Sequence, residues 1–167
     1  MEISLLLKAL EYKSWADRRT LDAVGTLDSV QGAASLAFAR QQLNHMVRVE
    51  ENFRARLLSK PGLHSSTNTE VVPDLADLDQ RLTASNTWLA SYAAELRTDQ
   101  VHQKLSFTFV DGLRGSMTPE EILFHIVNHG TYHRGAIGHA LDLARAKRPA
   151  DTYTVFIHAL EPQRRDA

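Results

Sequence analysis

The segment from Ser116 to Ala146 constrains the fold more than any other part of the sequence. Thr118, Pro119 and Glu121 together are typical of a helix start, with a capping residue, a proline at the first helical position and a carboxylate at the third. Apolar residues then recur at the spacing of one helix face, at Ile122, Ile126, Ile137, Ala140 and Ala144. The pattern predicts a long helix whose apolar stripe is interrupted by histidines.

Two of these histidines, His129 and His133, stand four residues apart on the predicted helix. At this spacing two imidazoles on one helix can bind the same metal ion. His125 lies four residues before His129 and offers an alternative pair, but all three cannot share one ion because eight residues of helix rise about 12 Å. We choose His129 and His133, since His133 lies near the centre of the stripe and His125 near its edge. The simpler alternative is a pair of packed core histidines.

Three further segments have the apolar periodicity of long helices, at about residues 3–24, 35–58 and 74–97. A long polar connection, residues 59–73, separates the second from the third. Alternating apolar residues between 101 and 117 predict a short hairpin, and residues 152–160 predict a short amphipathic C-terminal segment. We therefore expect an all-α fold, a four-helix bundle with a long second connection, in which metal sites are built from facing helices.

The second predicted helix supplies a third histidine, His45. It borders an apolar stripe that we expect to be buried, formed by Phe38, Leu43, Met46, Val49, Phe53 and Leu57. A 3.6-residue period turns the imidazole toward the bundle interior. Taken alone, His45 is more simply a packed or half-exposed histidine, but a histidine pair on another helix that lacks a third ligand makes it the candidate partner.

Four polar residues lie close to these histidines in the sequence, namely Glu50, Glu51, Asn128 and Arg134. Neighbouring residues on a helix point in different directions, so we interpret these as solvated side chains and name no catalytic residue. His64 in the polar connection is also expected to be solvated. Gly130 occupies the position of the glutamate base of HExxH proteases, which argues against that class of hydrolase.

Composition limits the kinds of partner and site. The 167 residues are 43% hydrophobic and 23% charged, so we expect one domain, residues 1–167, with a sizeable core. The formal net charge is −1 and the basic residues are scattered, so the sequence predicts no basic patch that would bind nucleic acid. Without cysteine, disulfides and thiolate ligands are excluded, and a cytoplasmic location fits. The apolar N-terminal run is too short for a signal peptide or a membrane span.

Two stretches, LNHMVRVEENF around His45 and HIVNHGTYHRGAI around His129 and His133, resemble the DinB-like family of metal-binding bundles, which is related to YfiT-type and thiol-transferase proteins. YKSWADRRTL near the start gives weaker support, and the resemblance covers nearly the whole chain. It implies a four-helix bundle with one divalent metal ion held by three histidines, which here fall on His45, His129 and His133. It also implies a homodimer and, in some relatives, a reaction that uses a low-molecular-weight thiol.

Two classes of function are compatible with these residues. Three imidazoles would leave a metal ion with an open position, where a water or a thiol loses its proton near neutral pH, as a hydrolase or a thiol-dependent S-transferase requires. Since the chain has no cysteine, the thiol would arrive as a small-molecule co-substrate. Imidazole suits both Zn²⁺ and Ni²⁺. The alternative is a non-catalytic stress-response or binding protein that the metal merely stabilises.

Overall fold

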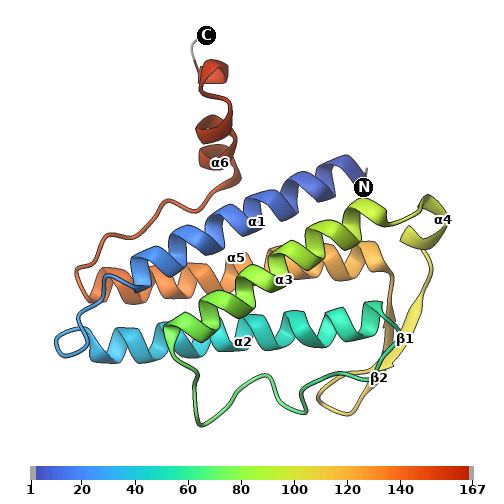
Figure 1. Ribbon diagram of the computed structural model, residues 1–167, viewed down its shortest axis with the longest axis horizontal. Helices are drawn as coiled ribbons and strands as arrows, with labels where there is room; N and C mark the ends of the chain where they lie inside the picture. Colours follow the sequence, from blue (N-terminus) through green and yellow to red (C-terminus); the bar gives the residue numbers. More distant parts are fainter. Residues whose placement is uncertain (1–2, 166–167) are drawn as a thin grey trace.

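The computed structural model describes residues 3–165, which are mostly helical (Figure 1). Within this range four long helices form a bundle: α1 (Ile3–Val24), α2 (Ala33–Leu57), α3 (Leu75–Glu95) and α5 (Pro119–Leu143). Helices α1 and α2 each pack against both α3 and α5, so the four enclose a common core. The predicted all-α bundle is confirmed. The domain expected over residues 1–167 extends beyond the described part by two residues at each end.

A short hairpin lies at one end of the bundle, next to the C-terminal end of α2 (Figure 1). Strand β1 (Leu105–Thr108) pairs antiparallel with β2 (Arg114–Met117), and Gly112 in the turn adopts a positive φ of 85°. The hairpin predicted between residues 101 and 117 is therefore confirmed. The helix that precedes it, α4 (Thr98–Val101), was not predicted, because four residues are too few to show a helical period.

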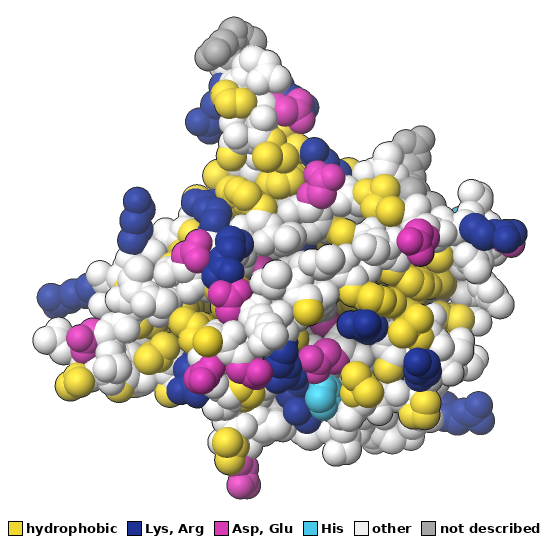
Figure 2. Space-filling view, in the orientation of Figure 1, with side chains coloured by type: hydrophobic (Ala, Val, Ile, Leu, Met, Phe, Trp, Pro, Cys, Tyr) yellow, Lys and Arg dark blue, Asp and Glu magenta, His cyan; other side chains and the backbone are white. Residues whose placement is uncertain are grey.

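The C-terminal helix α6 (Tyr153–Leu160) projects away from the bundle and is followed by a 3₁₀ turn, η1 (Pro162–Arg165) (Figure 1). Its base is packed, with the Phe156 ring 5.8 Å from the Tyr12 ring and 5.5 Å from the Trp15 ring. Figure 2 shows hydrophobic side chains gathered at this base. Leu160 near the tip is 50% exposed, so α6 covers the bundle with only part of its apolar surface.

The core follows most of the predicted apolar stripes. The predicted core residues Ile122, Ile126 and Ile137 of α5 are buried. On α2, however, Phe38 is 45% exposed, and its neighbour Ala39 is fully buried instead. The prediction for Phe38 was wrong because the helix turns Ala39 toward the core, on the same face as the buried residues four and seven positions later.

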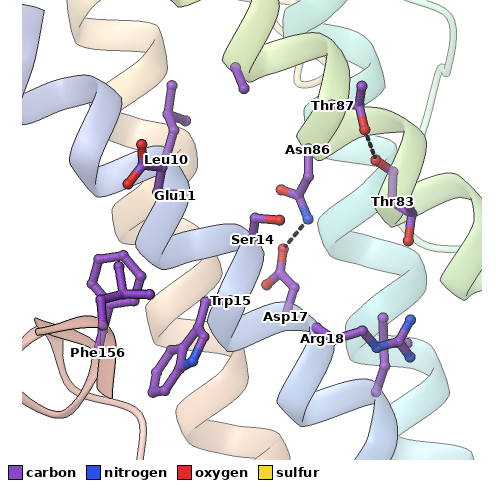
Figure 3. A pocket seen from close by; sticks show the side chains of 13 residues that line it. Leu10, Glu11, Ser14, Trp15, Asp17, Arg18, Thr83, Asn86, Thr87 and Phe156 are labelled. Carbon is purple, nitrogen blue, oxygen red and sulfur yellow. Dashed lines mark hydrogen bonds between the residues drawn. The ribbon is translucent and has the colours of Figure 1, made fainter. Parts of the chain in front are cut away.

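A network of buried ion pairs crosses the middle of the bundle. Lys13 Nζ on α1 lies 2.7 Å from Asp17 Oδ2 and 2.8 Å from Glu50 Oε1 on α2. The amide of Asn86 on α3 donates to Asp17 (Figure 3), and Arg134 Nη1 on α5 lies 2.8 Å from Asp17 Oδ1. Glu50 and Arg134 are thus buried, and their interpretation as solvated charges was wrong. Counter-charges on facing helices make this burial possible.

Candidate metal centre

The histidines of α5 have a defined register because the start of this helix is capped. Thr118 Oγ1 accepts a hydrogen bond from the Glu121 amide at 3.2 Å, and Glu121 Oε2 accepts one from the Thr118 amide at 2.8 Å. This reciprocal cap, which the sequence predicted, sets where the first turn begins. From there α5 carries His129 and His133 on the face that packs against α2.

The structure brings His45, His129 and His133 together. His129 Nε2 lies 3.1 Å from His45 Nε2 and 3.0 Å from His133 Nε2. One ring nitrogen from each histidine lies within 4.8 Å of the other two, and no other His, Asp or Glu of residues 3–165 belongs to this group. All three rings are half-buried. Side chains from two facing helices therefore direct their nitrogens to one point.

These distances fit a metal ion better than a hydrogen-bonded cluster. A neutral imidazole nitrogen carries either one proton or one lone pair, so His129 Nε2 can form a hydrogen bond with only one of its two neighbours. Two nitrogens bound tetrahedrally at about 2.0–2.1 Å from one ion lie about 3.3 Å apart, close to the observed separations. The donor set of three imidazoles suits a divalent transition metal.

Hydrogen bonds orient two of the rings. His133 Nδ1 donates to Gln42 Oε1 on α2 at 2.6 Å, which leaves the Nε2 lone pair directed at the cluster. His45 has hydrogen-bond partners at Thr67 and Asn68 of the polar connection. The Gln42 contact holds His133 in the tautomer that a metal ligand needs, and the His45 contacts show that the long second connection helps to build the site.

The environment keeps these imidazoles neutral. Burial, and next the neighbouring histidines, lower the pKa of His129 to about 3. Burial also lowers the pKa of His133 to about 4, with a further contribution from His45. For His45 the pKa is lowered by burial too. Since only the neutral ring offers a lone pair, all three side chains are ready to bind a cation at physiological pH.

Comparison with known protein families matches residues 1–165 to the DinB family. The chain belongs to the DinB family. No curated protein and no solved structure gave a significant match. Family membership and the cluster of His45, His129 and His133 fit a metal-binding DinB-like protein, in which these three side chains could hold a metal ion.

His125 of this DinB protein lies beside the cluster and does not join it. Its ring centroid is 5.4 Å from that of His129 and 5.1 Å from that of Phe53, so it packs between the two. Burial lowers its pKa. Sequence periodicity placed His125 at the edge of the stripe, and the structure agrees.

Two other polar residues near the site differ from expectation. His64 was predicted to be solvated, but its ring is paired with the Glu51 carboxylate and both side chains are largely buried. Arg81 Nη2 on α3 also contacts Glu51 Oε2 at 2.7 Å, so the interpretation of Glu51 as solvated was wrong as well. Asn128 is exposed, as expected. Glu51 and His64 thereby tie the polar connection to the bundle, outside the histidine cluster.

A cavity of about 360 Å³ adjoins the histidine cluster of this DinB protein, with His45 and His129 in its wall. Its other lining residues come from α2, α5, the polar connection and the hairpin, namely Val49, Asn52, Phe53, Arg56, Thr67, Phe109, Val110, Met117 and His125. Sequence reasoning missed Asn52, Arg56 and Thr67. Spacing would have found Arg56, because it lies eleven residues after His45, close to three helical turns, on the same face of α2.

A larger cavity of about 600 Å³ lies elsewhere, between α1 and α3 (Figure 3). Trp15 lines it together with Leu10 and Phe156. Tyr12, which precedes Trp15 by three residues on α1, is buried and donates a hydrogen bond to Asp151. None of the clustered histidines borders this cavity.

Proposed function

We propose that this DinB protein is a metal-dependent enzyme for a small-molecule substrate. One divalent transition metal ion, Zn²⁺ or Ni²⁺, would be held by His45, His129 and His133, and a low-molecular-weight thiol would serve as co-substrate. One observation carries the proposal: three Nε2 atoms meet without a fourth His, Asp or Glu among residues 3–165, at the wall of a 360 Å³ cavity. A coordination position would therefore face a space large enough for a substrate.

The bound ion would supply a Lewis acid that lowers the pKa of a water or thiol at its open position. The residues of the chain would hold the ion and orient its ligands. His129 and His133 present neutral rings because burial lowers their pKa values, and Gln42 fixes the tautomer of His133. Phe53, on the cavity wall, replaces water beside the site with an apolar surface.

The lining of the cavity supports thiol transfer over hydrolysis. The ion would activate a bound water or a bound thiol alike. The distinction therefore rests on the wall of the cavity, which contains no Asp or Glu among the described residues and is largely apolar, as the organic body of a thiol requires. The apolar side chains of Val49, Phe53 and Met117 would contact the body of an organic substrate.

The alternative is a metal-stabilised protein without turnover. It is supported by the origin of the histidines, because an ion bound to His45 of α2 and to the pair on α5 would join two of the bundle's helices. A structural ion of this kind would raise the melting temperature strongly and would be closed to exogenous ligands.

A cobalt-substituted protein tests the proposal. We expect low-molecular-weight thiols to produce thiolate-to-metal charge-transfer bands, which a closed structural site cannot give. An absence of any spectral response to thiols, azide or carboxylates would show that the site is closed and would contradict the enzyme. The cytoplasmic location and the absence of nucleic-acid and membrane partners stay predictions. Among residues 3–165 no helix combines the length and apolar character needed to cross a bilayer.

A further inference from the structure

Arg56 is a buried cation in the wall of the cavity beside the histidine cluster. Its residue is only 8% exposed, and its Nη2 donates a hydrogen bond to the Thr108 carbonyl of the hairpin at 2.9 Å. Within the described part of the chain it forms no ion pair with any Asp or Glu. The remaining N–H groups of the guanidinium are therefore available to a ligand.

Arg134 is another buried arginine of this protein, and its charge is paired with acidic side chains. It is buried more deeply than Arg56, yet it lies 2.8 Å from both Asp17 and Asp151, and its pKa is raised even though burial opposes this. For Arg56, burial alone acts, and the pKa is lowered. A buried charge without a counter-charge is unfavourable, so an anionic ligand that pairs with Arg56 would be stabilised there.

Three aromatic rings surround the Arg56 guanidinium without using its N–H groups. The centroids of Phe53, Phe107 and Phe109 lie 5.4, 4.9 and 5.8 Å from its central carbon. Such contacts stabilise a partly desolvated cation and limit its movement. They keep the guanidinium in place for a ligand but do not neutralise it.

The cavity connects this cation to the histidines along one face of α2. His45, Val49, Asn52 and Arg56 follow one another at intervals of four, three and four residues, and all line it. Eleven residues of helix rise about 16 Å, which sets the scale of the separation between the two ends of this face. The Asn52 amide is engaged on both sides by the His64 backbone, which leaves the Arg56 guanidinium as the anion-binding group.

We propose that this cavity selects a small organic acid whose carboxylate pairs with Arg56 while a donor atom at its other end, such as a thiolate, reaches the metal. The inference rests on the proposed function. Arg56 is the single Lys or Arg among the cavity's lining residues, and one positive charge matches a monoanionic carboxylate rather than a dianionic phosphate. The apolar side chains between the two ends would contact the hydrocarbon body.

A series of mercaptoalkanoic acids and the mercaptoalkanols of equal length tests the proposal on the cobalt-substituted protein. The charge-transfer band gives the dissociation constant of each ligand. We expect the acid of optimal length to bind about 10–100-fold more tightly than its alcohol, as a charge-assisted hydrogen bond provides. Arg56→Gln should remove this difference and leave the affinity for the alcohol unchanged.

Lys104→Gln is the matched control. Lys104 lines a separate cavity of about 580 Å³ on the other side of Arg56, so its removal takes away one positive charge without changing the cavity at the histidines. The acid should keep its advantage in this variant. Loss of the advantage in Lys104→Gln would place the anion in the other cavity and overturn the assignment.

The outcomes separate this inference from the proposed function. If neither acid nor alcohol gives a charge-transfer band, the open metal position is wrong. If both bind equally to the unmodified protein, or if the advantage survives Arg56→Gln, the role of Arg56 is wrong while the metal site stands. Should Arg56→Gln fail to fold, Arg56→Lys replaces it; that variant keeps the charge but loses the fork of donors, and it should reduce the advantage.

Discussion

Lys13 Nζ lies 2.8 Å from Glu50 Oε1, with 0% and 1% of the two side chains exposed. The pair joins α1 to α2, and Lys13 also contacts Asp17 at 2.7 Å and Asn86 at 2.7 Å. Its ammonium protons thus meet acceptors from three helices. The charge of the same lysine also acts on the histidine cluster, because it is one of the neighbouring charges that lower the pKa of His129.

Lys13→Met is expected to lower the free energy of unfolding by about 3–5 kcal/mol, because it leaves the buried Glu50 carboxylate without its cation. Chemical denaturation measures this change. Lys8→Met is the control: Lys8 forms a solvent-screened pair with Glu11, and its loss should change stability far less than the loss of Lys13 does. If Lys13→Met were as mild as the control, the network would not stabilise the bundle.

The purified protein is expected to carry about one divalent ion per chain, and His129→Ala or His133→Ala should remove it. Each variant leaves two imidazoles where three are needed for tight binding. Elemental analysis measures the stoichiometry. His139→Ala serves as control, since His139 is an exposed residue on the same helix outside the cluster, and it should leave the metal content unchanged. Full metal content in both ligand variants would exclude this site.

Gln42→Ala should weaken metal binding by about 10–100-fold, because His133 loses the acceptor that orients its ring. His125→Gln should weaken it by no more than this, since His125 makes ring contacts with His129 and Phe53 and is not in the cluster. Competition with a chelator gives both affinities. A complete loss of metal in His125→Gln, with His133 replaceable, would reverse the assignment of the pair.

The metal-free protein should become less stable as the pH falls from about 6.5 to about 4. In the folded state the pKa of His129 is about 3 and that of His133 about 4, because burial lowers both. The unfolded histidines titrate near their ordinary value of about 6.5, so within this window the unfolded state binds more protons. Above the window both states are neutral and the effect vanishes.

Thermal unfolding across this pH range, in the presence of a chelator, measures the dependence. The double variant His129→Gln, His133→Gln removes both titrating groups and should flatten the slope. An equal slope in the variant and in the unmodified protein would assign the acid sensitivity to other groups.

We expect a homodimer, as the family resemblance implies. Light scattering should give about twice the chain mass of 18.7 kDa at micromolar concentration. Leu160 on the projecting α6 lines the cavity of Figure 3 and is half exposed, so Leu160→Asp should shift the protein toward the monomer. Leu143→Asp, an exposed apolar site on α5, is the matched control. A mass of one chain for the unmodified protein would refute dimerisation.

Local sequence signals predicted the helices and the histidine pair. The cap of Thr118 and Glu121 involves residues three apart, and His129 and His133 are one turn apart, so neither depends on the rest of the fold. Periodicity also turned His45 inward, because it reports the angle of a side chain on its own helix. The helix boundaries differ from the predicted ones by a few residues at most.

Only the tertiary structure determined which of the charged residues are buried. Glu50 and Arg134 have the sequence context of surface charges, and they are buried because Lys13 and Asp17 of another helix face them. Arg56 likewise becomes a candidate anion-binding group only in the folded protein, where it contacts the Thr108 carbonyl of the hairpin and has no acidic partner among the described residues. A charge can be buried only where partners from other helices meet it, and a sequence records the angle of each residue on its own helix but not which residues of other helices lie opposite.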